Sequence, residues 1–203
     1  ARALAEALGA QEALSEPAAV AELCAEMPAG TTLFVANSMP LRDLEAVAPA
    51  TDKPIRVLSN RGASGIDGTA STALGVAAAS AGPTVLLTGD LAFLHDLNGL
   101  WAARRHGLSL TVLLLNNDGG GIFSFLDVAD YPERFEELFG TPHGIDFAPA
   151  VRMYGGRFTR AESRGELRTA LREAFVAPGL SVVEARTTRS DNLAVHRRLF
   201  ADV

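Results

Sequence analysis

Oxygen-donor side chains and glycines gather in two short segments of the sequence. The first is Gly89-Asp90, which follows the apolar run TVLLT, and the second is NNDGGG at residues 116–121, which follows LTVLLL. A carboxylate, an amide oxygen and a backbone carbonyl are hard ligands suited to octahedral Mg²⁺. Each segment alone is typical of an ordinary turn. Together, at the ends of two consecutive interior strands, they predict a cation between Asp90 and Asn117 whose remaining ligands are diphosphate oxygens and water.

The elements that would position these segments alternate between strand and helix. Apolar strands separated by helices indicate an α/β fold, a parallel sheet flanked by helices on both faces. Ligands of such sheets bind beyond the carboxyl ends of the strands. We expect the helix that begins near Asp96 to aim its N-terminus at the anion, and the glycines to let the backbone approach phosphate closely.

The expected strands cover residues 31–36, 55–58, 84–88, 108–115, 157–160 and 180–185. The expected helices cover 17–27, 40–47, 69–81, 96–106, 146–154, 164–176 and 190–201, and residues 118–144 are expected to be irregular.

Composition narrows the class of protein. The chain has 203 residues and is 48% hydrophobic, enough for a sizeable core. A formal net charge of -6 argues against nucleic acid as a partner. The single cysteine, Cys24, cannot form an internal disulfide and is expected to be a small buried apolar residue. No run is long enough to span a membrane and no signal peptide is evident, so we expect no membrane association and a cytoplasmic location.

The spacing of the two segments is that of a known signature. Residues 89–117, GDLAFLHDLNGLWAARRHGLSLTVLLLNN, resemble the thiamin diphosphate motif, which runs from Gly-Asp to Asn-Asn. Many members of this family have glycine at the third position, where this chain has Leu91. The resemblance implies that Asp90, Asn117 and the carbonyl of Gly119 hold Mg²⁺, or Mn²⁺, against the diphosphate of the cofactor.

Three blocks in order narrow the resemblance further. NRGASGIDG at residues 60–68, GDLAFLHDLNGL at 89–100 and NNDGGGIFSFL at 116–126 resemble the 2-succinyl-5-enolpyruvyl-6-hydroxy-3-cyclohexene-1-carboxylate synthases of menaquinone biosynthesis. That family implies thiamin diphosphate-dependent decarboxylation of 2-oxoglutarate and addition of the succinyl unit to isochorismate, by a homodimer or homotetramer. It also implies a thiamin diphosphate-binding fold at residues 16–203, preceded at 1–15 by a linker or the end of an upstream domain.

Site residues carry over from the resemblance one by one. The positions matched to the substrates are Ser38, Arg42, Arg61, Ile122 and Phe123. Guanidinium groups suit dicarboxylates because they bind carboxylate bidentately and stay charged. The positions matched to the cofactor are Ser64, Gly65, Ile66, Gly89, Asp90, Leu91, Asn117, Gly119, Gly120 and Ile122. Simpler interpretations remain open, namely an exposed helix arginine for Arg42, loop packing for Ile66 and core packing for Ile122 and Phe123.

No catalytic residue is expected in this chain. The resemblance implies that the glutamate that activates the cofactor comes from an N-terminal pyrimidine-binding domain, and we expect neither that domain nor the middle domain within this chain. Glu16 and the other glutamates fall in helical or solvent-facing patterns. His95, His106, His143 and His196 have no metal-ligand spacing, and a dinucleotide-binding glycine motif is absent.

Three other functions stay open. The chain could belong to another thiamin diphosphate enzyme, such as an acetohydroxyacid synthase or a keto-acid decarboxylase, although Leu91 and the block at 60–68 speak against it. It could be a non-catalytic phosphate-binding module, or a structural domain that mediates oligomerisation.

Overall fold

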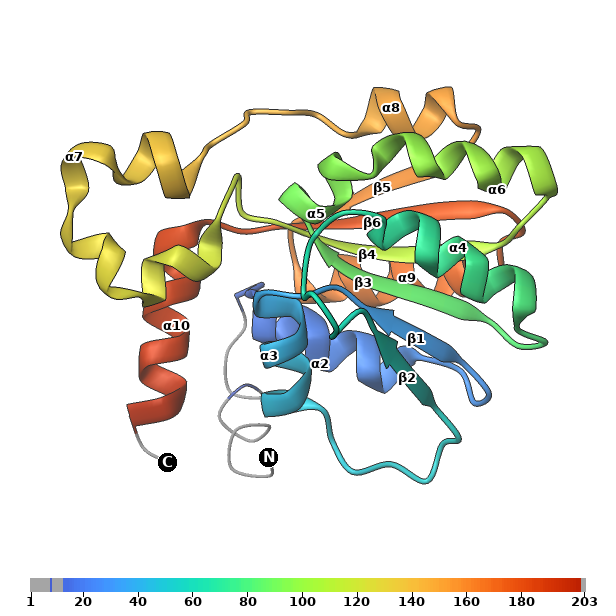
Figure 1. The fold of residues 1–203 in the computed structure, drawn as a ribbon. Helices are drawn as coiled ribbons and strands as arrows, with labels where there is room; N and C mark the ends of the chain where they lie inside the picture. The colour runs from blue at the N-terminus through green and yellow to red at the C-terminus, as the bar shows by residue number, and fades with distance from the viewer. Residues whose placement is uncertain (1–7, 9–12, 202–203) are drawn as a thin grey trace.

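The computed structural model describes residue 8 and residues 13–201. Its centre is a six-stranded sheet in the order β2-β1-β3-β4-β6-β5, with every neighbouring pair parallel (Figure 1). The strands are β1 (Thr32–Val35), β2 (Arg56–Ser59), β3 (Thr84–Gly89), β4 (Leu110–Asn116), β5 (Arg157–Ala161) and β6 (Leu180–Arg186). The α/β fold expected from the sequence is confirmed. The linker expected at residues 1–15 lies mostly outside the described residues.

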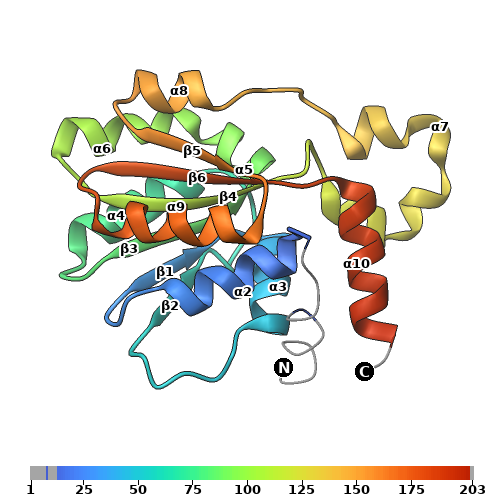
Figure 2. The ribbon, with the colours of Figure 1, turned by 180° about the vertical axis from the view of Figure 1, so that it is seen from behind.

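Helices cover both faces of the sheet. One face carries α2 (Glu16–Glu26), α3 (Met39–Val47) and α9 (Arg164–Val176), as Figure 2 shows from behind. The other carries α4 (Thr69–Ala79), α5 (Asp90–His95), α6 (Trp101–His106) and α8 (Ala148–Met153). One short helical turn, η1 (Leu97–Leu100), connects α5 to α6. Four more lie between β4 and α8, namely η2 (Gly121–Phe125), η3 (Asp127–Asp130), α7 (Pro132–Phe135) and η4 (Glu136–Gly140). Helix α10 (Arg189–Ala201) ends the described chain.

Alternation along the central strands builds two cores. In β4, Leu113 and Leu115 pack into the core beneath α2, α3 and α9, whereas Val112 and Leu114 pack into the opposite core. Successive side chains of a strand point to opposite faces, so a strand that is buried throughout must be apolar on both. All seven residues of β4 are buried, while the edge strand β2 is half exposed.

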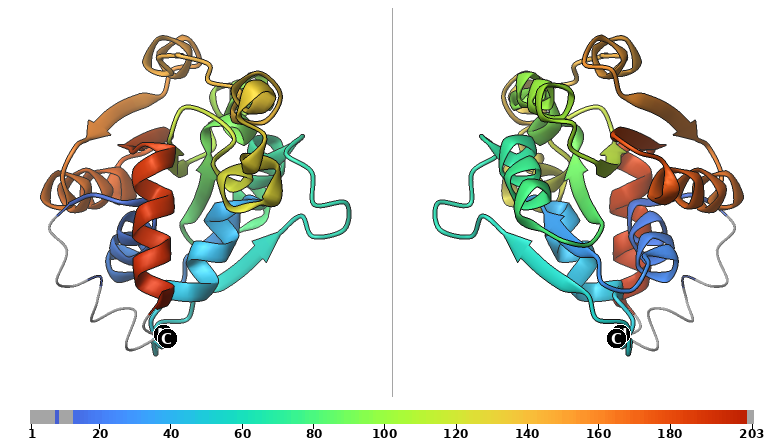
Figure 3. Two further views of the ribbon diagram at one scale, coloured as in Figure 1. Left: turned by 90° about the vertical axis from the view of Figure 1, so that its left-hand side faces the viewer. Right: turned by 90° about the vertical axis from the view of Figure 1, so that its right-hand side faces the viewer.

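The order of the strands places a crevice between β1 and β3. The chain passes from β1 outward to β2 and then returns past β1 to β3, so the connections after β1 and β3 leave on opposite faces. Ligands of open parallel sheets bind at such a switch point, outside the carboxyl ends of the strands. Figure 3, left, looks onto this end of the sheet, with α10 and residues 121–140 nearest the viewer.

Two expected elements are wrong in detail. The helix expected over 96–106 is instead α5, η1 and α6, and α5 begins at Asp90 itself. Asp96 does not start a helix that faces an anion. Its carboxylate accepts hydrogen bonds from the backbone N–H of Ser71 (2.6 Å) and the Ser71 hydroxyl (2.9 Å), so it ties α4 to this segment. Residues 121–140, expected to be irregular, form successive helical turns.

Among the described residues, no helix has both the length and the apolar composition that crossing a bilayer requires.

A buried histidine–aspartate pair ties α10 to α3. His196 Nε2 lies 2.5 Å from Oδ1 of Asp43, and His196 Nδ1 lies 2.8 Å from the carbonyl oxygen of Asn192. Burial alone would lower the pKa of His196, but the hydrogen bond and the charge of Asp43 raise it above the ordinary 6.5. Because both ring nitrogens face acceptors, the protonated ring is favoured in the folded protein.

The raised pKa of His196 predicts that the free energy of unfolding falls as the pH rises from 6.5 through the folded-state pKa. The folded protein binds this proton more tightly than the unfolded chain, so the stabilisation is complete below pH 6.5 and is lost above it. Urea unfolding at a series of pH values measures the slope. Asp43→Asn should flatten it, whereas Asp52→Asn, on an exposed loop, should not. Equal slopes for wild type and Asp43→Asn would contradict the assignment.

Candidate functional site

A pocket of about 420 Å³ occupies the crevice at the carboxyl ends of β1, β3 and β4. It is lined by the loops that follow these strands, by the start of α3 and by Glu16 at the start of α2. Every residue that the sequence predicts for cofactor, substrate or metal lines this pocket except Gly65. Gly65 adjoins it, and its carbonyl oxygen accepts a hydrogen bond from the Asn37 side chain (2.7 Å).

Asp90 is held rigidly at the end of β3. Its Oδ1 accepts from the backbone N–H of Leu91 (2.7 Å), and its Oδ2 accepts from the backbone N–H of Gly119 beyond β4 (3.0 Å). The residue is 2% exposed. Burial raises the pKa of Asp90, and the Gly119 hydrogen bond opposes that rise. A cation beside Asp90 would favour the ionised carboxylate.

Asn117 lines the same pocket and has an unpaired side-chain oxygen. Its Nδ2 donates to Oε1 of Glu16 (2.7 Å), and its Oδ1 is buried with no hydrogen-bond partner in the described part of the chain. An unpaired buried acceptor is costly, so it indicates a missing donor or a cation. A hard-oxygen set of carboxylate, amide oxygen and backbone carbonyl fits Mg²⁺ or Mn²⁺. Residues 8 and 13–201 contain no cluster of three His, Cys, Asp or Glu side chains that could hold a metal.

The glycines at 119–121 are required by packing within the protein. A Cβ on Gly119 would lie 1.9 Å from the carbonyl oxygen of Gly140, and one on Gly120 would lie 2.2 Å from that of Phe139. Gly119 also has φ +138°, which favours glycine. The expectation that these glycines serve close approach to phosphate is therefore incomplete. Gly89 differs, because a Cβ there would meet nothing within 4 Å in the open pocket.

His143 lies against Asp90, a contact that the sequence did not indicate. Its Nε2 is 3.3 Å from Oδ2 of Asp90 but has no partner in hydrogen-bond geometry among the described residues. Its Nδ1 accepts from the backbone N–H of Ile145 (3.0 Å), which assigns the ring proton to Nε2. Asp118, with φ +61°, holds this loop by accepting from the backbone N–H groups of His143 (3.0 Å) and Gly144 (2.7 Å). Only the fold brings residue 143 back to strand β3.

Glu16 is a second residue whose place was not expected. Predicted to lie in a helical or solvent-facing pattern, it begins a helix but is 1% exposed and lines the pocket. Burial, followed by the charge of Asp43, raises the pKa of Glu16 to about 7. The Thr187 hydroxyl also donates to its Oε1 (3.3 Å).

The rim of the pocket carries two guanidinium groups. Arg61 donates to Oδ1 of Asn37 (2.7 Å), and Arg42 donates to the carbonyl oxygen of Ser38 (2.9 Å). Asn37 also donates to the carbonyl oxygen of Asn60 (3.1 Å), so it fixes the loop after β2 to the end of β1. Ser38 has φ 72° and ψ -141°, a strained conformation for a residue with a Cβ. Strained residues of this kind cluster at functional sites.

Apolar side chains also line the pocket. Ile122, Phe123 and Leu91 line the pocket with Ile66, which is 37% exposed. Phe123 packs edge-on against Phe139, with ring centroids 5.4 Å apart, so the turn after β4 is anchored to η4. The open position of Ile66 suits contact with a ligand better than core packing.

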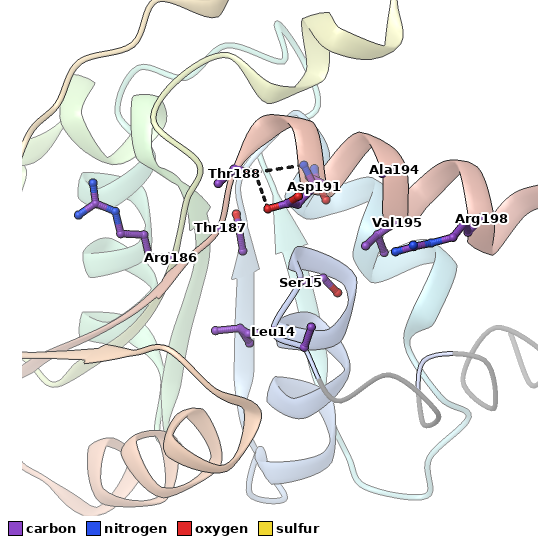
Figure 4. A pocket seen from close by; sticks show the side chains of 11 residues that line it. Leu14, Ser15, Arg186, Thr187, Thr188, Asp191, Ala194, Val195 and Arg198 are labelled. Carbon is purple, nitrogen blue, oxygen red and sulfur yellow. Dashed lines mark hydrogen bonds between the residues drawn. The ribbon is translucent and has the colours of Figure 1, made fainter.

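A larger pocket, of about 790 Å³, lies between the start of α2 and α10 (Figure 4). Its lining includes Ser15, Thr188, Asp191 and Arg198. Thr188 and Asp191 hydrogen-bond to each other (2.7 Å), as the dashed lines show. Asn192 also lines this pocket, and its buried Oδ1 and Nδ2 have no hydrogen-bond partner in the described part of the chain. The smaller pocket is the better candidate, because it lies at the strand ends and is lined by the residues that the sequence predicts for the site.

Comparison with known proteins identifies a family. Residues 45–185 match the family described as "Thiamine pyrophosphate enzyme, C-terminal TPP binding domain". Two relatives named 2-succinyl-5-enolpyruvyl-6-hydroxy-3-cyclohexene-1-carboxylate synthase are 56% identical over 90% of this chain (Geobacillus thermodenitrificans) and 54% identical over 94% (Myxococcus xanthus). The matches cover 31% and 32% of those relatives, so the chain spans about a third of their length. The resemblance found from the sequence blocks is confirmed.

Solved structures agree on the fold. The benzoylformate decarboxylase of Polynucleobacter necessarius superposes with a TM-score of 0.71 at 20% identity, over 85% of this chain and 33% of that one. A putative thiamin diphosphate-dependent enzyme of Mycobacterium smegmatis gives 0.69 at 21% identity, over 86% and 32%. At this identity the likeness extends to the fold alone. By its sequence match over residues 45–185, the chain belongs to the thiamine pyrophosphate enzymes and carries their C-terminal TPP-binding domain.

Proposed function

We propose that the pocket binds thiamin diphosphate through a divalent cation held by Asp90, Asn117 and the carbonyl oxygen of Gly119. The observation that carries the proposal is the buried, unpaired Oδ1 of Asn117, a residue that lines the same pocket as the Asp90 carboxylate at the end of the adjacent strand. Mg²⁺ or Mn²⁺ would satisfy both groups, and the diphosphate would supply further oxygen ligands. Gly89 leaves open space at the same strand end.

We further propose that the protein is a 2-succinyl-5-enolpyruvyl-6-hydroxy-3-cyclohexene-1-carboxylate synthase acting on 2-oxoglutarate and isochorismate. Relatives with this name, at up to 56% identity, support the proposal. When bound, thiamin diphosphate supplies an electron sink for decarboxylation of a 2-oxo acid. Arg42 and Arg61 would bind substrate carboxylates, since they form no ion pair within the described residues and line the pocket.

This chain supplies only part of such a site. The chain spans about a third of its relatives' length, and the acid–base group that activates the cofactor is expected in the remaining segments. Those segments would also cover the pocket, close the wall at Ile66 and allow assembly into a homodimer or homotetramer. We therefore expect the chain alone to bind cofactor weakly and to have no turnover.

Replacing Asp90 with asparagine should abolish the Mg²⁺-dependent part of thiamin diphosphate binding. The variant keeps the shape of the side chain and loses the anionic ligand, so affinity should fall at least about tenfold. Calorimetric titration of cofactor into the chain, with and without Mg²⁺, measures this. Asp96→Asn is the matched control, because Asp96 is also buried but bonds Ser71 outside the pocket. Unchanged binding in the Asp90 variant would refute the metal assignment.

A methyl group at position 89 should obstruct the cofactor without harming the fold. A Cβ on Gly89 meets no protein atom within 4 Å, so the free energy of unfolding should change by less than about 1 kcal/mol. Cofactor affinity should fall, because the methyl group enters the pocket. Gly165→Ala, exposed on α9 with equally open surroundings, is the control. Full cofactor affinity in Gly89→Ala would show that the ligand binds elsewhere.

Substrate use separates this function from its competitors. In a polypeptide that also carries the segments preceding the matched region in the relatives, 2-oxoglutarate and isochorismate should be consumed together, and pyruvate should be a poor donor. Arg61→Ala should raise the KM for a dicarboxylate substrate by at least about tenfold, from the loss of a charge-assisted contact. Preference for pyruvate would indicate an acetohydroxyacid synthase-like enzyme. Equal binding of ATP and thiamin diphosphate, insensitive to Mg²⁺, would indicate a phosphate-binding module.

A further inference from the structure

A buried glutamate contacts Asn117 in the lining of the pocket. Glu16 is the first residue of α2, whose N-terminus is capped by Ser15, and its side chain is 1% exposed. Its Oε1 accepts from Asn117 Nδ2 at 2.7 Å and from the Thr187 hydroxyl at 3.3 Å. The contact joins residues 101 positions apart, from a helix start to the end of a central strand.

This hydrogen bond fixes the orientation of the Asn117 amide, with Nδ2 toward Glu16 and Oδ1 away from it. The oxygen and nitrogen of an asparagine amide are nearly equal in shape, so neighbouring groups decide their orientation. If the amide were turned over, Oδ1 would face the Glu16 oxygen, and two acceptors would meet without a donor. A metal needs the oxygen, because the amide NH₂ group has no lone pair to offer a cation.

We propose that Glu16 is a positioning residue of the metal site, which directs Oδ1 of Asn117 into the pocket by accepting a hydrogen bond from Nδ2. The inference rests on the proposed function, because the orientation of this amide matters only if Asn117 binds a metal. Partners outside the ligand shell commonly orient metal-binding side chains in this way.

Stability alone does not account for a carboxyl group at this position. Burial is unfavourable for it, since the pKa of Glu16 rises to about 7, mainly through desolvation. An apolar side chain of similar size would avoid that cost. As a carboxylate, Glu16 can only accept, so it selects the orientation with Nδ2 toward it. A protonated carboxyl group could also donate to Oδ1 and would not select between the two orientations.

Calorimetry on the chain with thiamin diphosphate at a series of Mg²⁺ concentrations tests the proposal. Glu16→Leu removes the acceptor, and the Mg²⁺ concentration needed for half-maximal cofactor binding should rise about 10- to 100-fold. Glu16→Gln keeps an acceptor oxygen and should retain most of the affinity. Glu22→Gln is the matched control. Glu22 is a second buried carboxylate on α2, but it pairs with Arg164 and Arg168 away from the pocket.

The outcomes separate the two proposals. Wild-type chain that binds no cofactor in a Mg²⁺-dependent manner would overturn the proposed function itself. If the wild type binds, an unchanged Mg²⁺ requirement in Glu16→Leu overturns the positioning role. Equal losses in the Leu and Gln variants also overturn it, because they would assign the effect to charge and not to orientation.

A reversed pair tests the same idea if the Leu variant does not fold. Asn117→Asp alone sets two carboxyl groups against each other and should weaken Mg²⁺-dependent binding. The double variant Glu16→Gln/Asn117→Asp restores one donor and one acceptor, with a carboxylate oxygen left facing the pocket. It should bind cofactor more tightly than Asn117→Asp alone. The two changes should therefore be strongly non-additive, and additive losses would overturn the proposal.

Discussion

The hydrogen bond from the Gly119 backbone to the Asp90 carboxylate joins the ends of two neighbouring strands, and the geometry of the pocket depends on it. β3 and β4 are parallel and paired in register, so their carboxyl ends meet at one edge of the sheet. The bond fixes the turn after β4 against the residue after β3. That turn carries Asn117 on one side and the apolar residues Ile122 and Phe123 on the other. A shift of this turn would therefore alter metal ligand and pocket wall together.

The sequence was sufficient for whatever depends on neighbouring residues in the chain. Buried strands such as β4 are recognisable because they are apolar on both faces, and the parallel pairing of β3 and β4 follows from the helices between them. It failed where local preference competes with a distant contact. The sequence predicted a helix that begins near Asp96 and faces an anion, yet the Asp96 carboxylate accepts a hydrogen bond from Ser71 on α4. Glu16 contacts Asn117, which lies 101 residues further along the chain, and His143 contacts Asp90, which lies 53 residues before it. No local sequence pattern indicates such contacts.

The sequence identified the glycines after β4 correctly, but it gave an incomplete reason for them. Their presence suggested room for phosphate, but Gly119 and Gly120 are confined by the backbone of residues 139 and 140. The packing holds the turn close to η4, and the hydrogen bond from Gly120 N–H to the Gly140 carbonyl (2.8 Å) fixes the approach. Close approach of protein backbone to itself shapes the turn first. Any advantage for a ligand is a consequence of that shape.

The distribution of charge gives the pocket a direction. The inner end of the pocket is acidic, because Asp90 and Glu16 are buried there. The charges of Asp43 and Asp90 both raise the pKa of Glu16. Its rim is basic, with Arg42 and Arg61 exposed and bonded only to neutral acceptors. Two unscreened carboxyl groups at the inner end are unfavourable unless a cation or protons accompany them. A dianionic substrate would be repelled there and attracted at the rim. A cofactor whose metal-bound diphosphate lies at the inner end and whose reacting centre lies near the arginines matches this distribution of charge. The charges therefore support a proposed arrangement in which the substrates meet the cofactor at the rim.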